Sequence, residues 1–141
     1  MIYLDTSVLG ALFFREPSAP EILSRLESVP GTELVISAWT LAEMASVGAI
    51  KERTGQIGAQ DRAAGLAAFQ RFVTDTLKLV EVDPGDFRTA ATLLDLPVTA
   101  LRAADALHLA IARRLRADLA TLDRRQGIAA SHYGIGLFPV G

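Results

Sequence analysis

The 141-residue sequence contains no cysteine and only two lysines. The absence of cysteine excludes disulfide bonds, thiolate metal sites and cysteine nucleophiles. No apolar run approaches the roughly 20 residues of a membrane-spanning helix, so we expect no membrane association. The first residues contain neither a basic segment nor a long apolar core. We therefore expect no signal peptide and a cytoplasmic protein.

Arginine supplies twelve of the fourteen basic residues, against sixteen acidic residues. The formal net charge of −2 argues against a uniformly basic nucleic-acid binder. Five arginines nevertheless gather near the C-terminus: Arg113, Arg114, Arg116, Arg124 and Arg125. Because guanidinium groups bind phosphate bidentately, Arg113, Arg114 and Arg116 are candidate contacts for a phosphate backbone. The alternative is that they stabilise the end of a helix, where cations are favoured.

Short apolar runs alternate with longer helical patterns along the chain. The runs do not alternate between apolar and polar residues, which is typical of strands covered on both faces. Predicted strands occupy residues 2–5, 33–36, 79–82, 118–122 and 136–139. Predicted helices occupy residues 7–14, 18–28, 38–54, 59–76, 84–95, 101–116 and a short segment after Asp123. This order predicts one α/β domain over residues 1–141, with a central parallel sheet of about five strands and helices on both faces.

Four acidic residues occupy positions at which an isolated carboxylate is costly. Asp5 and Asp123 each follow an apolar strand directly, whereas Glu43 and Asp105 lie within apolar helical segments. The carboxyl ends of parallel strands share one edge of a sheet with the neighbouring helix ends, so we expect the four acids to converge. Taken singly, Asp5 or Asp123 could be only a helix N-cap. The joint pattern favours one shared site.

A cation would make such a site stable. Carboxylates about 4 Å apart repel one another by about 4 kcal/mol per pair at an effective dielectric of about 20. A divalent cation removes most of this cost, and ligation by oxygen alone favours Mg²⁺ or Mn²⁺ over zinc. The sequence therefore predicts a divalent-cation centre, and phosphodiester hydrolysis is a reaction that such centres commonly support.

Two further side chains lie at helical spacing from Asp105. Arg102, three residues before it, could hold its carboxylate or contact a substrate phosphate, and the alternative is a surface ion pair. His108, three residues after it, shares nearly the same helical face. This histidine could support the metal ligands or transfer a proton, and the alternative is a packed core histidine.

With these residues in place, the sequence resembles PIN-domain ribonucleases, and within that group VapC-type toxins of toxin–antitoxin pairs. The matching segments are Tyr3-Leu4-Asp5-Thr6-Ser7, Ile36-Ser37 with Glu43 six residues on, the segment from Arg102 to Ala110, and the segment from Leu119 to Asp123. Together they cover nearly the whole chain in the family's order and spacing.

The resemblance implies a metal-dependent endoribonuclease fold. Its acidic quartet, which binds Mg²⁺ or Mn²⁺ and acts catalytically, corresponds to Asp5, Glu43, Asp105 and Asp123. Hydroxyl positions near that site correspond to Thr6 or Ser7 and to Thr121. The resemblance also implies an RNA substrate, a homodimer and a cognate antitoxin that keeps the enzyme inactive.

Other functions are weighed against this one. A phosphorelay receiver needs a lysine at the end of its last strand, and neither Lys51 nor Lys78 lies at such a position. A housekeeping PIN-domain nuclease without an antitoxin would carry the same four acids. A non-catalytic binding module would use them to accept arginine from a protein partner.

Overall fold

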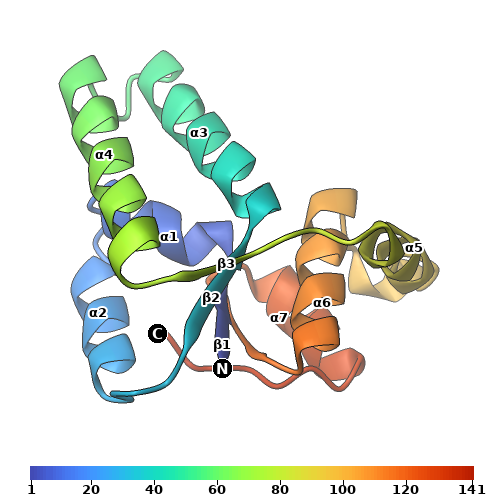
Figure 1. Ribbon diagram of the computed structural model, residues 1–141. Helices are drawn as coiled ribbons and strands as arrows, with labels where there is room; N and C mark the ends of the chain where they lie inside the picture. Colours follow the sequence, from blue (N-terminus) through green and yellow to red (C-terminus); the bar gives the residue numbers. More distant parts are fainter.

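A parallel sheet in the strand order β3-β2-β1-β4 runs through the middle of the computed structural model, which describes residues 1–141 except for the side chain of Val98. Its strands are β1 (Ile2–Leu4), β2 (Leu34–Ser37), β3 (Lys78–Val80) and β4 (Asp118–Ala120). The helices are α1 (Thr6–Phe13), α2 (Ala19–Glu27), α3 (Ala38–Arg53), α4 (Ala59–Asp75), α5 (Pro84–Leu93), α6 (Ala103–Leu115) and α7 (Arg124–His132). Helices α1, α2 and α4 lie on one side of the sheet and α5, α6 and α7 on the other (Figure 1).

The sheet separates two apolar cores. Successive strand residues point to opposite faces, so Ile2 and Leu4 pack with α1, α2 and α4, whereas Tyr3 packs with α5, α6 and α7. All three side chains are buried, at 3%, 0% and 0% exposure in the order Ile2, Tyr3, Leu4. This double coverage explains the uniformly apolar strands and confirms the predicted α/β class. Among the described residues, no helix is long and apolar enough to cross a membrane.

The predicted strand at residues 136–139 is wrong. This segment forms one isolated parallel bridge to β4, between Leu119 and Leu137. Leu119 donates its N–H to the Gly136 carbonyl and Phe138 donates its N–H to the Leu119 carbonyl, and no further main-chain hydrogen bond joins the two segments in the described part of the chain. The segment therefore leaves the sheet edge instead of forming a fifth strand.

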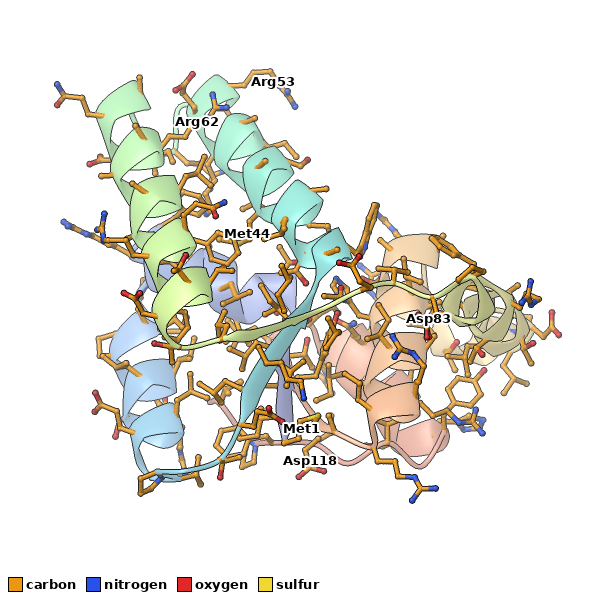
Figure 2. All side chains as sticks on the ribbon, in the orientation of Figure 1. Met1, Met44, Arg53, Arg62, Asp83 and Asp118 are labelled. Carbon is orange, nitrogen blue, oxygen red and sulfur yellow. The ribbon has the colours of Figure 1, made fainter. Side chains whose placement is uncertain are left out.

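The seven predicted helices are present, with ends that differ by a few residues at most. The predicted helix at 101–116 begins at Ala103 because a short 3₁₀ turn, η1 (Pro97–Thr99), precedes it. Gly55, at φ +77°, reverses the chain between α3 and α4. The two helices form a hairpin that projects from the sheet, with Arg53 and Arg62 near its tip (Figure 2).

Helix α4 of this hairpin packs tightly against α1. A Cβ atom on Gly65 of α4 would lie 2.6 Å from the carbonyl oxygen of Phe13 and 2.9 Å from the ring of Phe14. Backbone cannot move aside as a flexible side chain can, so α4 can approach α1 this closely only with glycine at position 65.

We expect Gly65→Ala to lower the free energy of unfolding by about 1–3 kcal/mol, because overpacking outweighs the better helix propensity of alanine. Gly85→Ala is the matched control, since a Cβ atom at Gly85 meets nothing within 4 Å. Urea unfolding of the two variants measures the difference. A Gly65→Ala variant as stable as wild type would contradict the tight packing.

Candidate active site

Asp5 is anchored where β1 ends and α1 begins. Its Oδ1 accepts hydrogen bonds from Ser7 Oγ at 2.5 Å and from the Val8 N–H at 3.2 Å, so Asp5 is the N-cap of α1. Its Oδ2 accepts a hydrogen bond from Thr121 Oγ1 at 2.6 Å, which links α1 to the chain following β4. Burial raises the pKa of Asp5, and the bonds from Ser7 and Thr121 offset only part of this rise.

Glu43 lies about two turns into α3 and is held by two partners. Its Oε1 accepts a hydrogen bond from Thr6 Oγ1 at 2.7 Å and contacts His108 Nε2. The other ring nitrogen of His108 lies 2.7 Å from the Tyr3 hydroxyl, which donates to Ser37 Oγ at 2.9 Å. Burial alone would raise the pKa of Glu43, but His108 and Thr6 lower it overall. His108 is thus a buried partner of a candidate ligand.

Asp105 and Asp123 complete the acidic edge. Asp123 caps α7, because its Oδ1 accepts the N–H groups of Arg125 at 2.9 Å and of Gln126 at 3.3 Å. Asp105 lies in the first turn of α6. Burial raises the pKa of Asp105, and the negative charges of Asp123 and, more weakly, Glu43 raise it further. The negative charges of Asp123 and Glu43 therefore both oppose the ionisation of Asp105.

Thr121 and Gln126 join the elements around these acids. Besides its bond to Asp5, Thr121 Oγ1 accepts the N–H of Asp123 at 3.0 Å. Gln126 is 1% exposed, and its Nε2 donates to the main-chain carbonyl of Asp105 at 3.4 Å. Gln126 is a residue of this site that the sequence did not reveal. The only signal was a polar residue in the first turn of α7, where most polar side chains are solvated.

A groove opens beside the carboxyl edge of the sheet, and two of the four acids line it. The groove has a volume of about 370 Å³. Glu43 and Asp123 line it, together with Thr6 and Ser7. Asp5 supports it from beneath, since Ser7 and Thr121 both bind this aspartate.

Asp5, Glu43 and Asp123 are each held by hydrogen-bond donors. No three histidine, aspartate or glutamate side chains among the described residues lie at metal-ligand spacing. Glu43 Oε2 and Asp123 Oδ2, however, accept no hydrogen bond from any described residue. A set of carboxylate oxygens with free acceptors and mutual repulsion fits a hard divalent cation such as Mg²⁺ or Mn²⁺.

The structure gives Arg114 a different role from the predicted contact with substrate. Its guanidinium pairs with Asp86 through Nε–Oδ1 at 2.8 Å and through a second contact to Oδ2 at 2.9 Å. The same group donates to the main-chain carbonyl of Glu81 at 3.0 Å and lies 3.4 Å from Asp83 (Figure 2). Arg114 therefore ties α6 to the start of α5. Asp86 lies 28 positions from Arg114 in the sequence, so the spacing of nearby residues could not reveal this ion pair.

The other predicted arginines are exposed. Arg113 and Arg116 lie at the C-terminal end of α6, and a rise of about 1.5 Å per residue places Arg113 about 12 Å from Asp105. Arg102 precedes α6 and makes no ion pair with any residue that the structure describes. The structure thus brings the acids, hydroxyls and His108 together, but not these arginines.

Comparison with known proteins agrees with the fold and the motifs. The family model of the PIN domain matches residues 2–130. Ribonuclease VapC47 of Mycobacterium tuberculosis (strain CDC 1551 / Oshkosh) is 33% identical over 121 residues, which are 84% of this chain and 79% of that protein.

Two solved structures illustrate the structural likeness. M. tuberculosis VapC20, described as a sarcin-ricin loop cleaving toxin, has a TM-score of 0.67 at 20% identity, over 92% of this chain and 95% of its own. A toxin–antitoxin complex from Klebsiella pneumoniae has a TM-score of 0.60 at 24% identity, over 87% of each chain.

We expect Asp105→Asn to raise the melting temperature at pH 7 without divalent cations. The folded-state pKa of Asp105 lies above its ordinary value of 3.8, so ionisation destabilises the fold. This loss grows as the pH rises from 3.8 through the folded-state pKa and persists at pH 7. Removing the charge should therefore stabilise the protein at pH 7 and not below pH 3.8.

Thermal melts in EDTA at pH 7 and at pH 3 measure this effect, and each 1 kcal/mol should shift the melting temperature by about 4 °C. Asp95→Asn, at an exposed loop position, is the control for loss of one negative charge. A variant that melts at or below the wild-type temperature at pH 7 would contradict the repulsion among the acids.

Proposed function

The chain belongs to the PIN domain family, and from this premise we propose that it is a metal-dependent endoribonuclease and the toxin of a toxin–antitoxin pair. Residues 1–141 form its single nuclease domain. The observation that carries the proposal is the gathering of Asp5, Glu43, Asp105 and Asp123 at one edge of the sheet, beside an open groove. A relative named as a ribonuclease, 33% identical over 84% of the chain, supports the choice of RNA.

The four carboxylates would hold the cation. When bound, a divalent cation lowers the pKa of an attacking water and offsets negative charge on the phosphodiester. The chain restrains the ligands in advance, because Ser7 and Thr121 bind the two oxygens of Asp5, and Thr6 with His108 holds one oxygen of Glu43. Restrained ligands keep their free oxygens aimed at the groove, so little reorganisation is needed when substrate binds.

The contact between His108 and Glu43 also favours the ionised carboxylate. The lowered pKa of Glu43 keeps this side chain negative at neutral pH, which a cation ligand requires. Tyr3 and Ser37 hold the imidazole from its other side, and burial raises the pKa of the Tyr3 phenol so that it stays protonated. These residues position Glu43 and do not contact the groove.

We expect the purified protein to cleave RNA in Mg²⁺ or Mn²⁺ and to lose this activity in Asp5→Asn and Asp105→Asn. Loss of one carboxylate from the centre should lower the rate by about 100-fold or more, because electrostatic stabilisation by a metal is worth several kcal/mol. Mapping of 5′ ends in total RNA after brief induction, wild type against Asp105→Asn, locates the cleaved sites. Asp95→Asn should cleave as wild type does.

A divalent-ion titration of the melting temperature gives a second readout. A ligand that binds only the folded state stabilises it, so Mn²⁺ should raise the melting temperature of wild type more than that of Asp105→Asn. If no divalent ion stabilises wild type and Asp105→Asn merely melts higher, the metal-dependent nuclease is excluded.

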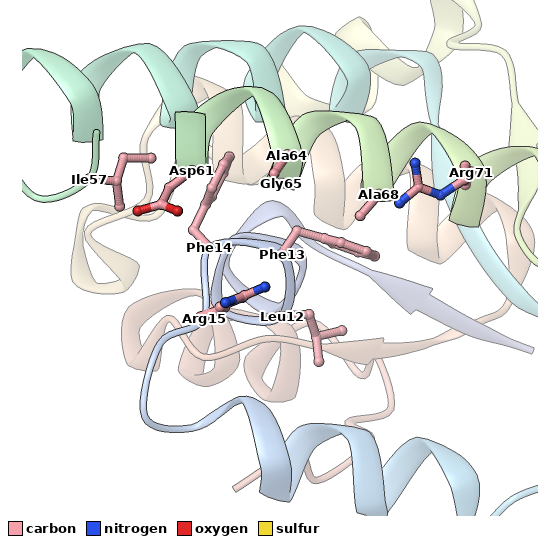
Figure 3. Close-up of a pocket in the computed structure, with 10 residues that line it drawn as sticks. All are labelled: Leu12, Phe13, Phe14, Arg15, Ile57, Asp61, Ala64, Gly65, Ala68 and Arg71. Carbon is pink, nitrogen blue, oxygen red and sulfur yellow. The ribbon is translucent and has the colours of Figure 1, made fainter. Parts of the chain in front are cut away.

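An apolar surface beside α1 suits an antitoxin partner. Phe13 contacts the rings of Phe69 and Phe72 at centroid distances of 5.7 and 5.5 Å, and two hollows open on either side of it. One lies between α1 and α4, with Arg15, Asp61 and Arg71 at its rim (Figure 3). The other, of about 470 Å³, lies between α1, α2 and α4.

Leucines supply much of the wall of this second hollow. Leu23 lines it and is 50% exposed. Exposure to water does not stabilise a leucine side chain, so a partner that covered Leu23 would be favoured. An amphipathic segment of the antitoxin would bury these side chains, as partner helices commonly do in apolar grooves. The likeness to a toxin–antitoxin complex supports this partner.

We expect induction of the protein to arrest growth and co-expression of its antitoxin, encoded by a short neighbouring gene, to relieve the arrest. Leu23→Glu should stay toxic but escape neutralisation, because a buried carboxylate weakens the apolar contact. Leu94→Glu, at an exposed leucine after α5, should be neutralised normally. The absence of such a neighbouring gene would argue for a housekeeping nuclease, and normal neutralisation of Leu23→Glu would place the antitoxin elsewhere.

A further inference from the structure

A second groove lies along α7, next to the candidate active site. It has a volume of about 630 Å³, which is within the range of small-ligand sites. Its walls are the end of β4, one face of α7 and the C-terminal segment from Leu137 to Gly141. The groove exists because this segment leaves β4 after one bridge, so the space beside Thr121 is not filled by a fifth strand.

The second groove adjoins the first. Leu122 and Asp123 line both of them, so a ligand that crosses Leu122 would reach from one groove into the other. Leu122 is 37% exposed, and its N–H is held by Ser7 Oγ at 2.9 Å, which fixes the ridge between the grooves. A strand bound at the acids would thus continue directly onto α7.

The walls of the second groove are apolar and open. Ile128 is 56% exposed and Leu137 is 44% exposed. Between them, Gly127 contributes no side chain, and a Cβ atom there would lie only 3.8 Å from the Thr121 methyl group. Ser131 adds one hydroxyl to the lining. Flat apolar walls with few polar groups suit the face of a base that has left its stack.

Two arginines lie at this groove without a charged partner. Arg124 lines it beside the candidate ligand Asp123, Arg125 follows, and neither arginine forms an ion pair with any described residue. The apolar hollow between α1, α2 and α4 differs, since its one charged lining residue is Glu27. Free arginines beside apolar walls therefore favour RNA on α7, whereas the other hollow favours a protein segment.

From these observations we propose that the groove formed by Arg124, Ile128 and Leu137 binds an unstacked base of the RNA strand adjacent to the cleaved phosphate. The site makes cleavage depend on the identity of that base. This inference rests on the proposed ribonuclease function, because it assigns a specificity site to the same catalytic centre.

Titration with the four ribonucleoside 5′-monophosphates tests binding without requiring cleavage. Amide NMR signals of Gly127 and Leu137 should shift with at least one of the four, and Ile128→Glu should weaken that affinity by about tenfold or more, because a carboxylate in the apolar wall loses the contact with the base and repels the phosphate. Ile50→Glu is the matched control, at an isoleucine that is 42% exposed on α3. The inference is overturned if none of the four shifts these amides, or if Ile128→Glu binds as wild type does.

Arg124→Gln separates the base from the phosphate. It should weaken binding of the monophosphate by about tenfold, the usual worth of one charge-assisted contact, and leave binding of the matching nucleoside unchanged. Equal loss for nucleoside and monophosphate would show that Arg124 only shapes the groove, and would overturn its assignment as the phosphate contact.

Mapped cleavage ends separate this inference from the proposed function. Ile128→Glu should change the base distribution next to the cut, and Ile50→Glu should not. If wild type binds a monophosphate at α7 but cleaves no RNA, the proposed nuclease is wrong and the nucleotide site stands. If wild type cleaves RNA and Ile128→Glu leaves the base distribution unchanged while releasing the antitoxin, the groove belongs to the protein partner and the inference falls.

Discussion

One buried aspartate joins three segments of the chain by hydrogen bonds, and the fold depends on these contacts. Asp5 caps α1 through the Val8 N–H, binds the hydroxyl of Ser7, and accepts a hydrogen bond from Thr121 after β4. Burying this carboxylate is costly, as its raised pKa shows, and only a full set of donors makes the position tolerable. The same bonds close the carboxyl edge of the sheet, so the stability of that edge and the placement of the candidate ligands have one origin.

The other acids divide the electrostatic cost unequally. Glu43 is ionised easily because Thr6 and His108 compensate its burial, whereas Asp105 meets the charge of Asp123 with less compensation. Stability alone would not favour this repulsion. Replacing one of several like charges with a neutral side chain costs little free energy of folding. A function that depends on a cation requires an acid whose charge the protein does not compensate. A helix-capping role alone does not explain such an acid.

Much of this arrangement could be predicted from the sequence, because its signals are local. The apolar strand followed by Asp5 identifies both a buried strand and a cap, and small apolar neighbours identify Asp105 as an unusual helix residue. Contacts between distant segments left no such signal: Arg114 binds Asp86 from 28 positions away, and Gln126 reaches the Asp105 carbonyl. The strand predicted at 136–139 shows the same limit, because here a local pattern indicated a pairing that the fold does not make. Its apolar residues suit a strand, but the segment forms only one isolated bridge to β4, at Leu137.

The missing fifth strand also explains how one edge of the sheet can hold both the candidate catalytic acids and the proposed base-binding groove. A complete fifth strand beside β4 would bury Leu137 and fill the space over Thr121, which would end the groove at Asp123. Because the segment separates from the sheet instead, the groove lined by Glu43 and Asp123 adjoins a second groove along α7 that Arg124 lines. Acids that repel a polyanion and arginines that attract it are thus set side by side. In the proposed nuclease, a divalent cation held by these carboxylates would offset their negative charge, so that an RNA strand could lie along both grooves.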